Sequence, residues 1–379
     1  MQISVQRALF KEISDHIRNG TTALAENEMR YPATSYYDQE HLLQEKRLFE
    51  RLPLVVGNSA EVAEPGDFYA GEILGTPFVV VRQKDGSLKA FRNVCSHRGS
   101  PVVTKCTGNA SQFICPYHAW TYGLDGSLRG FYRPGFPNVD KAEMGMPQIG
   151  VAERHGLIWL RLDGAECDVA GLLGQEVDGE LTSFKLSDYV LERREIFEAQ
   201  INWKSVLDGF LEAYHFAPLH ADSIGPYFYA NLSPYAHFGL NGRMIGVRKS
   251  FDSLMEQDFT EGEILPHIAS NYQTFPNTVI VWQGDHFETW TSFPGDTPNS
   301  SRVLFMMLVP EDSKELYAKR WNRNMDIIKA TVMNEDWRMS EQVQSALSSV
   351  RNEEIVFGAN EPALQHFHRE LARELADMN

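Results

Sequence analysis

Two short segments, each with one cysteine and one histidine, constrain the fold of this chain most strongly. Cys95 and His97 form the first pair, and after seventeen further residues Cys115 and His118 form the second. Four such ligands could bind Zn²⁺ or a [2Fe-2S] cluster. A zinc finger with this ligand set usually pairs Cys with Cys and His with His. Mixed pairs instead suit a cluster in which one iron takes both thiolates and the other takes both imidazoles. The pattern favours the cluster, with structural zinc as the alternative.

Runs rich in β-branched and aromatic residues surround both pairs. Asp-Gly at 85–86 and again at 125–126 separates two such runs, which is a strong hairpin signal. Leu157–Arg161 is a further predicted strand. This alternation of strand and turn signals predicts a small antiparallel β domain over about residues 50–160. Cys106 and Cys167 match no ligand pattern and are expected to be inert thiols.

Length and charge narrow the class of protein. The chain has 379 residues, which predicts two to three domains, and its net charge is -16 without a basic cluster, so nucleic acid is not an expected partner. Apolar runs such as Thr76–Val81 are far shorter than the ~20 residues that span a bilayer. Met1–Glu12 lacks the apolar core of a secretion signal, so we expect a cytoplasmic protein without a membrane partner.

The remaining chain mixes helices and strands. Residues 1–45 are predicted to be helical, with a break near Tyr31–Thr34. The C-terminal part predicts an α+β domain with a central antiparallel sheet flanked by helices. Its expected strands are Thr278–Trp282, His286–Trp290 and Arg302–Val309, and its expected helices are Ile201–Ala217, Ser313–Leu347 and Pro362–Leu375.

A second group of chemically active residues lies in the first of these helices. Asp208, Glu212 and His215 stand at positions i, i+4 and i+7, which share one face of an α-helix. Ionisable groups among apolar neighbours are costly unless they are paired or bind a metal. Pro218 prevents a regular helix from continuing, so His220 can fold back beside His215. Two histidines and a carboxylate on one side of Fe(II) leave open positions for O2 and a substrate.

These segments resemble those of a known enzyme family. The runs 93–99 and 115–120 resemble the two cluster-binding loops of Rieske domains, and the segment with His215 and His220 resembles the mononuclear-iron motif of Rieske non-haem iron oxygenases. The resemblance spans roughly residues 40–375. It implies an N-terminal helical segment at 1–45 that packs on the catalytic domain, a Rieske domain at 46–162 and a catalytic domain at 163–379.

The resemblance also implies roles for single residues. Asp336 matches the carboxylate ligand of the iron, with Glu335 as its main rival. Glu212 matches the carboxylate that bridges an iron-ligand histidine to the cluster of the neighbouring subunit of a trimer, with Asp208 as the alternative. A glutamate at this position is found in the choline and carnitine monooxygenase branch, although Gly209 stands where that branch has asparagine.

The activity implied is that of a terminal oxygenase component. It would use O2 and electrons from NAD(P)H, delivered by a flavin-containing reductase with or without a ferredoxin, to hydroxylate, cleave or demethylate a small organic substrate. The Glu212 resemblance favours a quaternary ammonium compound. The alternatives are mono- or dioxygenation of an aromatic or alicyclic substrate, and a Rieske electron-transfer protein without oxygenase activity.

Aromatic residues near the expected iron site are candidates for the substrate pocket. They would suit an aromatic substrate and would equally suit a quaternary ammonium group held by cation–π contacts. The candidates are Phe210, Tyr227, Phe228, Tyr272, Trp282 and Trp290. His366 and His368 lie on a predicted surface helix and are expected to be structural.

Overall fold

The computed structural model describes residues 1–378, apart from the side chain of residue 352, and divides into two compact units. One unit is Phe49–Val169, and the other combines Met1–Leu48 with Ala170–Asn379. The predicted boundaries at residues 46 and 163 lie slightly N-terminal to these divisions. None of the described helices combines the length and the apolar composition that crossing a bilayer requires.

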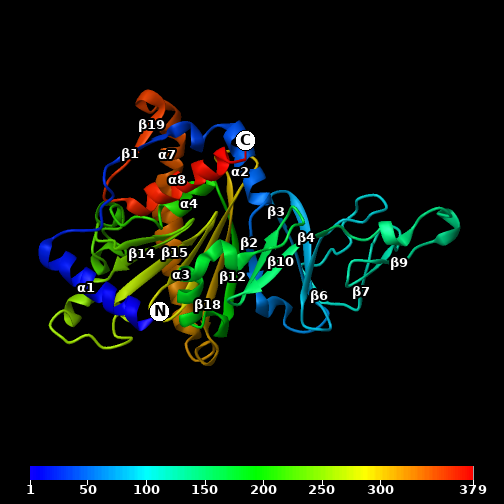
Figure 1. Cartoon of the computed structure of the whole chain (residues 1–379), viewed down its shortest axis with the longest axis horizontal. Helices are drawn as coiled ribbons and strands as arrows, with labels where there is room; N and C mark the ends of the chain where they lie inside the picture. Colours follow the sequence, from blue (N-terminus) through cyan, green and yellow to red (C-terminus); the bar gives the residue numbers. More distant parts are fainter. Residues whose placement is uncertain (379) are drawn as a thin grey trace. The chain divides into compact units, whose positions relative to one another are not determined.

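The unit Phe49–Val169 is built from antiparallel β-strands, as the sequence predicts (Figure 1). A seven-stranded sheet has the order β2 (Leu54–Asn58), β11 (Leu157–Arg161), β10 (Gln148–Arg154), β5 (Leu88–Arg92), β4 (Thr76–Arg82), β3 (Asp67–Ile73) and β6 (Thr107–Asn109). A separate three-stranded sheet contains β7 (Gln112–Ile114), β8 (Thr121–Gly123) and β9 (Leu128–Gly130). Cys95, Cys115, Trp120 and Tyr122 belong to the core of this unit.

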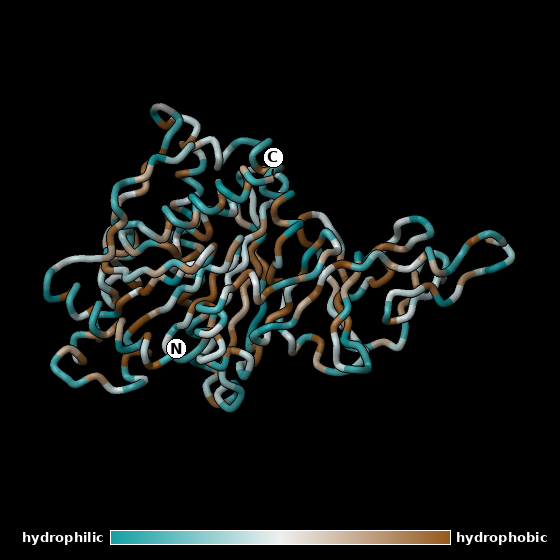
Figure 2. The backbone as a smooth tube through the Cα atoms, viewed as in Figure 1, coloured by the Kyte–Doolittle hydropathy of each residue, from teal (hydrophilic) through white to brown (hydrophobic). Residues whose placement is uncertain are grey.

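The other unit contains a second antiparallel seven-stranded sheet, which confirms the predicted α+β class. Strands β14 to β17 are buried along their whole length, and Figure 2 shows hydrophobic stretches along the strands of this unit. The order is β12 (Tyr189–Ala199), β18 (Ser301–Pro310), β17 (Phe287–Pro294), β16 (Thr278–Trp282), β15 (Ile268–Thr274), β14 (Asn241–Val247) and β13 (Tyr235–Phe238). The predicted strands in this region match β16, β17 and β18.

Helices and a small sheet complete this unit. Helix α8 (Pro362–Ala376) packs on β13 and β14, and α4 (Trp203–Asp208) packs on β17. The two-stranded sheet pairs β1 (Met29–Pro32) with β19 (Glu354–Phe357), and β1 makes the predicted break between the N-terminal helices. The helices are α1 (Ile3–Asn19), α2 (Gln39–Glu50), α3 (Val169–Ser183), α4 (Trp203–Asp208), α5 (Phe216–Leu219), α6 (Ala318–Ile328), α7 (Arg338–Ala346) and α8 (Pro362–Ala376).

The prediction of one helix over Ile201–Ala217 is wrong in its second half. Helix α4 ends at Asp208, and Gly209, whose helix propensity is low, follows it. The backbone N–H groups of Phe210 and Leu211 then bond three residues back, in tight turns. The carboxylate of Glu212 accepts hydrogen bonds from the backbone N–H groups of Tyr214 and His215, which starts a new turn. Such bonds from a side chain to the local backbone compete with a continuous helix.

The helix predicted over Ser313–Leu347 forms, with one unexpected feature. Between α6 and α7 the residues Lys329–Trp337 are wound as a π-helix. π-Helical turns are rare and occur frequently at functional sites. This turn carries Glu335 and Asp336, so the irregular winding coincides with the predicted iron ligand.

Candidate metal centres

The two cysteine–histidine segments fold into loops of the same shape. In the first loop the N–H of Cys95 donates to Ser100 O at 2.8 Å and the N–H of Gly99 donates to Cys95 O. In the second loop Cys115 N–H donates to Trp120 O at 2.9 Å, and Ala119 N–H donates to Cys115 O. Gly99 and Ala119 both have positive φ, at 76° and 58°. Alanine rarely adopts this conformation, so Ala119 carries a small backbone strain energy in the second loop that Gly99 does not carry in the first.

The four side chains sort by burial in a way that fits a Rieske-type cluster. The thiols of Cys95 and Cys115 are buried, His97 is half-buried and His118 is exposed. The two imidazole centroids are 4.6 Å apart, and His97 stacks on Trp120 at 5.0 Å. The Nδ1 atom of His97 is buried and makes no hydrogen bond with any described residue. A buried polar atom without a partner is costly, so it is available to a metal ion.

The surroundings of the Cys115 thiol favour the ionised form that a metal needs. Burial alone would raise the pKa of the Cys115 thiol, but hydrogen bonds from the backbone N–H groups of Tyr117 and His118 outweigh burial and lower it. The hydroxyl of Tyr122 lies 3.3 Å from Cys95 Sγ and accepts a hydrogen bond from the N–H of Ser96 at 3.0 Å.

In the other unit His215, His220 and Asp336 come together. One ligand atom from each lies within 4.8 Å of the others. Asp336 Oδ1 is 3.0 Å from His220 Nε2 and 3.6 Å from His215 Nε2. His220 is buried, whereas His215 and Asp336 are partly exposed. Two imidazoles and one carboxylate in this arrangement could hold a divalent iron with open positions.

Each of these histidines is also held from its other ring nitrogen. His215 Nδ1 contacts the carboxylate of Glu212. His220 Nδ1 lies 2.5 Å from Glu335 Oε2, and that oxygen also accepts a hydrogen bond from Ser223 at 2.7 Å. A carboxylate on Nδ1 fixes the ring and directs Nε2 toward the metal. The rival residues Glu335 and Asp336 therefore lie at opposite nitrogens of one imidazole.

Asp208, the alternative to Glu212 for the bridge, is engaged elsewhere. Its Oδ2 accepts a hydrogen bond from the Tyr36 hydroxyl at 2.7 Å, and its Oδ1 lies 2.8 Å from His368 Nε2. His368 is fully buried and stacks on Phe357. The prediction that His368 lies on the surface is therefore wrong, because this face of α8 packs against aromatic rings of β1 and of the turn that follows it. His366 is buried as well.

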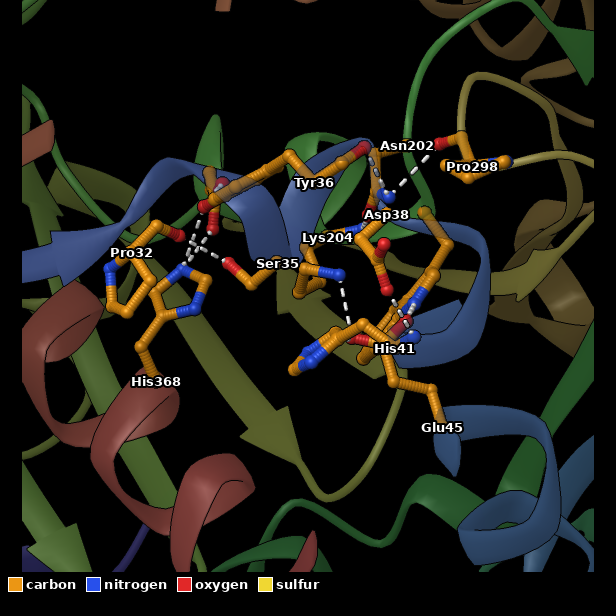
Figure 3. A network of polar contacts seen from close by, with 12 residues as sticks. Pro32, Ser35, Tyr36, Asp38, His41, Glu45, Asn202, Lys204, Pro298 and His368 are labelled. Atoms are coloured by element: carbon orange, nitrogen blue, oxygen red, sulfur yellow. Dashed lines mark hydrogen bonds and ion pairs between the residues drawn. The ribbon is translucent and has the colours of Figure 1, made fainter. Parts of the chain in front are cut away.

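A buried network around Tyr36 and Lys204 anchors the start of α4 (Figure 3). Lys204 and Glu45 form a fully buried ion pair at 2.5 Å, and Trp203 Nε1 donates to the second oxygen of Glu45 at 2.7 Å. Asn202 caps α4 by accepting from the Lys204 N–H, and its amide donates to Tyr36 O at 3.1 Å. These contacts hold α4 in place, and α4 leads into the loop that carries His215. No sequence pattern indicates that Glu45 is the partner of Lys204.

A cavity of about 640 Å³ opens at His215, His220 and Asp336. Phe210 and Phe228, two of the predicted pocket residues, line it. The other four candidates lie elsewhere. Tyr227 is 69% exposed, Tyr272 donates to Glu180 from within the sheet core, Trp282 bonds Leu265 O, and Trp290 packs behind Phe210.

The polar residues of the cavity wall were not predicted from the sequence. Asn271 lies on β15, Glu288 lies on β17, and Arg248 directly follows β14. Gln283, Asp285 and His286 lie in the turn between β16 and β17, and Arg320 and Asn324 lie on α6. Strand alternation was an available signal for Asn271 and Glu288 alone, because residues two apart share a face of the sheet.

Two protein families match the chain. Residues 53–142 match the Rieske [2Fe-2S] domain, and residues 186–377 match the ring hydroxylating alpha subunit (catalytic domain). These ranges contain the cysteine–histidine loops and the His215–His220–Asp336 group, respectively.

Similar proteins extend over most of the chain. The carnitine monooxygenase oxygenase subunit of Acinetobacter baumannii is 30% identical over 332 residues, covering 84% of this chain and 85% of the relative. The subunit of that name from Escherichia coli (strain K12) is 27% identical, covering 91% and 94%. The crystal structure of the quaternary ammonium Rieske monooxygenase CntA with L-carnitine shares the fold, with a TM-score of 0.75 and 24% identity, covering 93% of this chain and 96% of that one. The chain therefore belongs to the ring-hydroxylating alpha subunit family: it is a Rieske non-haem iron oxygenase with a [2Fe-2S] cluster and a mononuclear iron, and it depends on a partner reductase for electrons.

Proposed function

We propose that this oxygenase hydroxylates a quaternary ammonium compound, with C–N cleavage where the oxidised carbon is bound to nitrogen. One atom of O2 enters the product and the other leaves as water, with two electrons from the reductase and two protons. The observation that carries the proposal is the similarity over 84% of the chain to a carnitine monooxygenase oxygenase subunit. A Phe-lined cavity at the iron site supports it, because aromatic faces bind alkylammonium groups.

We assign His215, His220 and Asp336 as the iron ligands, and Cys95, His97, Cys115 and His118 as the cluster ligands. The bound iron supplies O2 activation, and the cluster supplies electrons one at a time. Glu335 orients His220 through Nδ1, and Glu212 does the same for His215. Asp208 supports the start of this loop through Tyr36 and His368.

We further assign Glu212 as the bridge for electron transfer between subunits of a homotrimer. Its contact with His215 supports this role, since the carboxylate oxygens of Asp208 are engaged with Tyr36 and His368 instead. Inter-subunit electron transfer is described for a quaternary ammonium Rieske monooxygenase that shares the fold. The reductase is expected to contain flavin, with or without a ferredoxin, and the compartment is expected to be the cytoplasm.

The experiment is a product analysis with the iron-loaded enzyme and a surrogate reductase. L-Carnitine, γ-butyrobetaine, glycine betaine and choline are compared with benzoate and a chlorinated benzene. The proposal requires product formation coupled to O2 uptake with at least one ammonium compound. Turnover of the aromatic compounds alone would instead establish a ring-hydroxylating activity.

A further inference from the structure

The ionisable side chains with which the sheet, its turns and α6 line the cavity already have partners. Arg248 donates hydrogen bonds to three backbone carbonyl oxygens and to one side-chain amide oxygen. The other four contact one another in the order Glu288, His286, Asp285 and Arg320. A substrate group that needs a free hydrogen-bonding partner on this wall therefore has to find it among the neutral side chains.

Asn271 is a neutral, buried side chain in the part of the sheet that lines the cavity. It lies on β15, a strand that is buried along its whole length. Its cross-strand neighbours are Met244 of β14 and Val281 of β16, and all three residues line the cavity. One amide is therefore flanked by two apolar side chains, neither of which can donate a hydrogen bond to it.

A single hydrogen bond fixes the orientation of this amide. Nδ2 of Asn271 donates to the carbonyl oxygen of Phe210 at 2.7 Å. A carbonyl oxygen only accepts hydrogen bonds, so Nδ2 and Oδ1 cannot exchange places. Among the described residues no donor contacts Oδ1, and this atom is not enclosed by the protein. Because Asn271 lies inside the sheet, Oδ1 is an acceptor that is open to the cavity.

The group that matches this acceptor is a hydrogen-bond donor of the substrate. A quaternary ammonium group has no N–H, so the donor in such a compound is a hydroxyl group. A hydroxyl group is neutral, which suits a position between Met244 and Val281, where no counter-charge is available. A buried acceptor without a partner is unfavourable, so a ligand that supplies the hydroxyl is preferred over one that lacks it.

We propose that Asn271 is a specificity-determining residue, and that its Oδ1 accepts a hydrogen bond from a hydroxyl group of the substrate. The inference rests on the proposed function and narrows the substrate class to quaternary ammonium compounds that carry a hydroxyl group. The same amide then binds the substrate through Oδ1 and, through Nδ2 and the Phe210 carbonyl, the loop that leads to His215.

Two pairs of compounds isolate the hydroxyl group. L-Carnitine and γ-butyrobetaine differ only by one hydroxyl, and so do choline and ethyltrimethylammonium. Binding of each compound is measured by calorimetry without O2, on the holoenzyme with iron and cluster content checked. The wild-type enzyme is expected to bind the hydroxylated member of at least one pair about fivefold more tightly, which is the contribution of one hydrogen bond.

The variant is Asn271→Leu, which removes the amide at similar size, with Gln273→Met as the matched control. Gln273 is a buried amide two residues further along β15, and within the described residues it does not line the cavity. Asn271→Leu is expected to bring the ratio of the two affinities to about one, whereas Gln273→Met keeps it. Asn271→Leu also removes the bond to Phe210 O, but that loss affects both members of a pair alike and leaves their ratio unchanged.

Two results would overturn the inference while the proposed function stands. One is equal affinity for both members of each pair in the wild-type enzyme, as expected if Oδ1 binds only water. The other is an unchanged preference in Asn271→Leu or, should that variant not fold, in Asn271→Ala, which also lacks the acceptor. Failure of the wild-type enzyme to bind or oxidise any of the four compounds would overturn the proposed function itself, and the inference with it.

Discussion

Glu335 holds His220 by the Nδ1 atom at 2.5 Å, on the side of the ring opposite Asp336. We expect Asp336→Ala to lose the mononuclear iron and Glu335→Gln to retain it with roughly 10- to 100-fold lower affinity. The measurement is iron per chain after gel filtration in a chelator series. Glu341→Gln, exposed on α7, is the control. Equal iron loss in the Glu335 and Asp336 variants would mean that both carboxylates bind the metal.

The contact between Glu212 and His215 predicts an electron-transfer defect. Glu212→Gln should lower coupled turnover by roughly 10- to 100-fold while the iron and the cluster remain bound. Cluster reduction by the reductase, followed in the visible spectrum, should be unchanged. The exposed Glu261→Gln serves as the control. Full coupled turnover in Glu212→Gln would remove Glu212 from the bridge.

The position of the Tyr122 hydroxyl near Cys95 Sγ predicts that this hydroxyl raises the reduction potential of the cluster. A hydrogen bond to a ligand sulfur stabilises the reduced, more negative state and raises the potential. Removing one bond of about 1 kcal/mol should lower the potential of a one-electron couple by about 40 mV. A redox titration of Tyr122→Phe measures the shift. A potential equal to that of the wild type would show that the hydroxyl does not donate to the sulfur.

The buried pair of Glu45 and Lys204 predicts an unusual order of stabilities. Glu45→Gln leaves Lys204 buried without its counter-ion, which costs about 3–5 kcal/mol. Replacing both residues by Met should cost less than this single change, because no buried charge remains. Thermal midpoints of the three proteins give the order. A double variant less stable than Glu45→Gln would contradict it.

His286 predicts a loss of stability in mild alkali. Its pKa is raised to about 9 in the folded chain, so its contribution is fully present below about pH 6.5 and is lost as the pH rises through 9. The shift corresponds to about 3 kcal/mol. His286→Gln should lack this component, so its thermal midpoint should change less between pH 6.5 and 9.5. Parallel pH profiles of the two proteins would rule out the contribution.

The grouping of the candidate metal ligands was easier to predict from the sequence than the lining of the cavity was. Ligands lie in short segments whose residue types and spacing follow from coordination chemistry, as for Cys95-x-His97. Runs of apolar residues such as Thr278–Trp282 also predicted β16 correctly. In contrast, the end of α4 depends on the carboxylate of Glu212 bonding two backbone N–H groups, and no helical periodicity encodes that.

Two of the wrongly predicted pocket residues share a geometric cause. Tyr272 and Trp282 are neighbours of Asn271 and Val281, which line the cavity, but successive residues of a strand point to opposite faces. Tyr272 therefore reaches Glu180 on the other side of the sheet. An aromatic residue of these strands can line the pocket only if its side chain points to the face of the sheet that carries the cavity. The register between neighbouring strands decides which face that is.

The helical segment that begins with α6 and continues through the π-helix joins Arg320 to Asp336 without a break. The number of residues between Arg320 and Asp336 therefore sets the direction in which Asp336 points. Inserting or deleting one residue of a helix turns everything beyond it by about 100°. Such a change between Arg320 and Asp336 would swing the carboxylate away from His220 even with every ligand present. This stretch should therefore tolerate substitutions far better than changes in length.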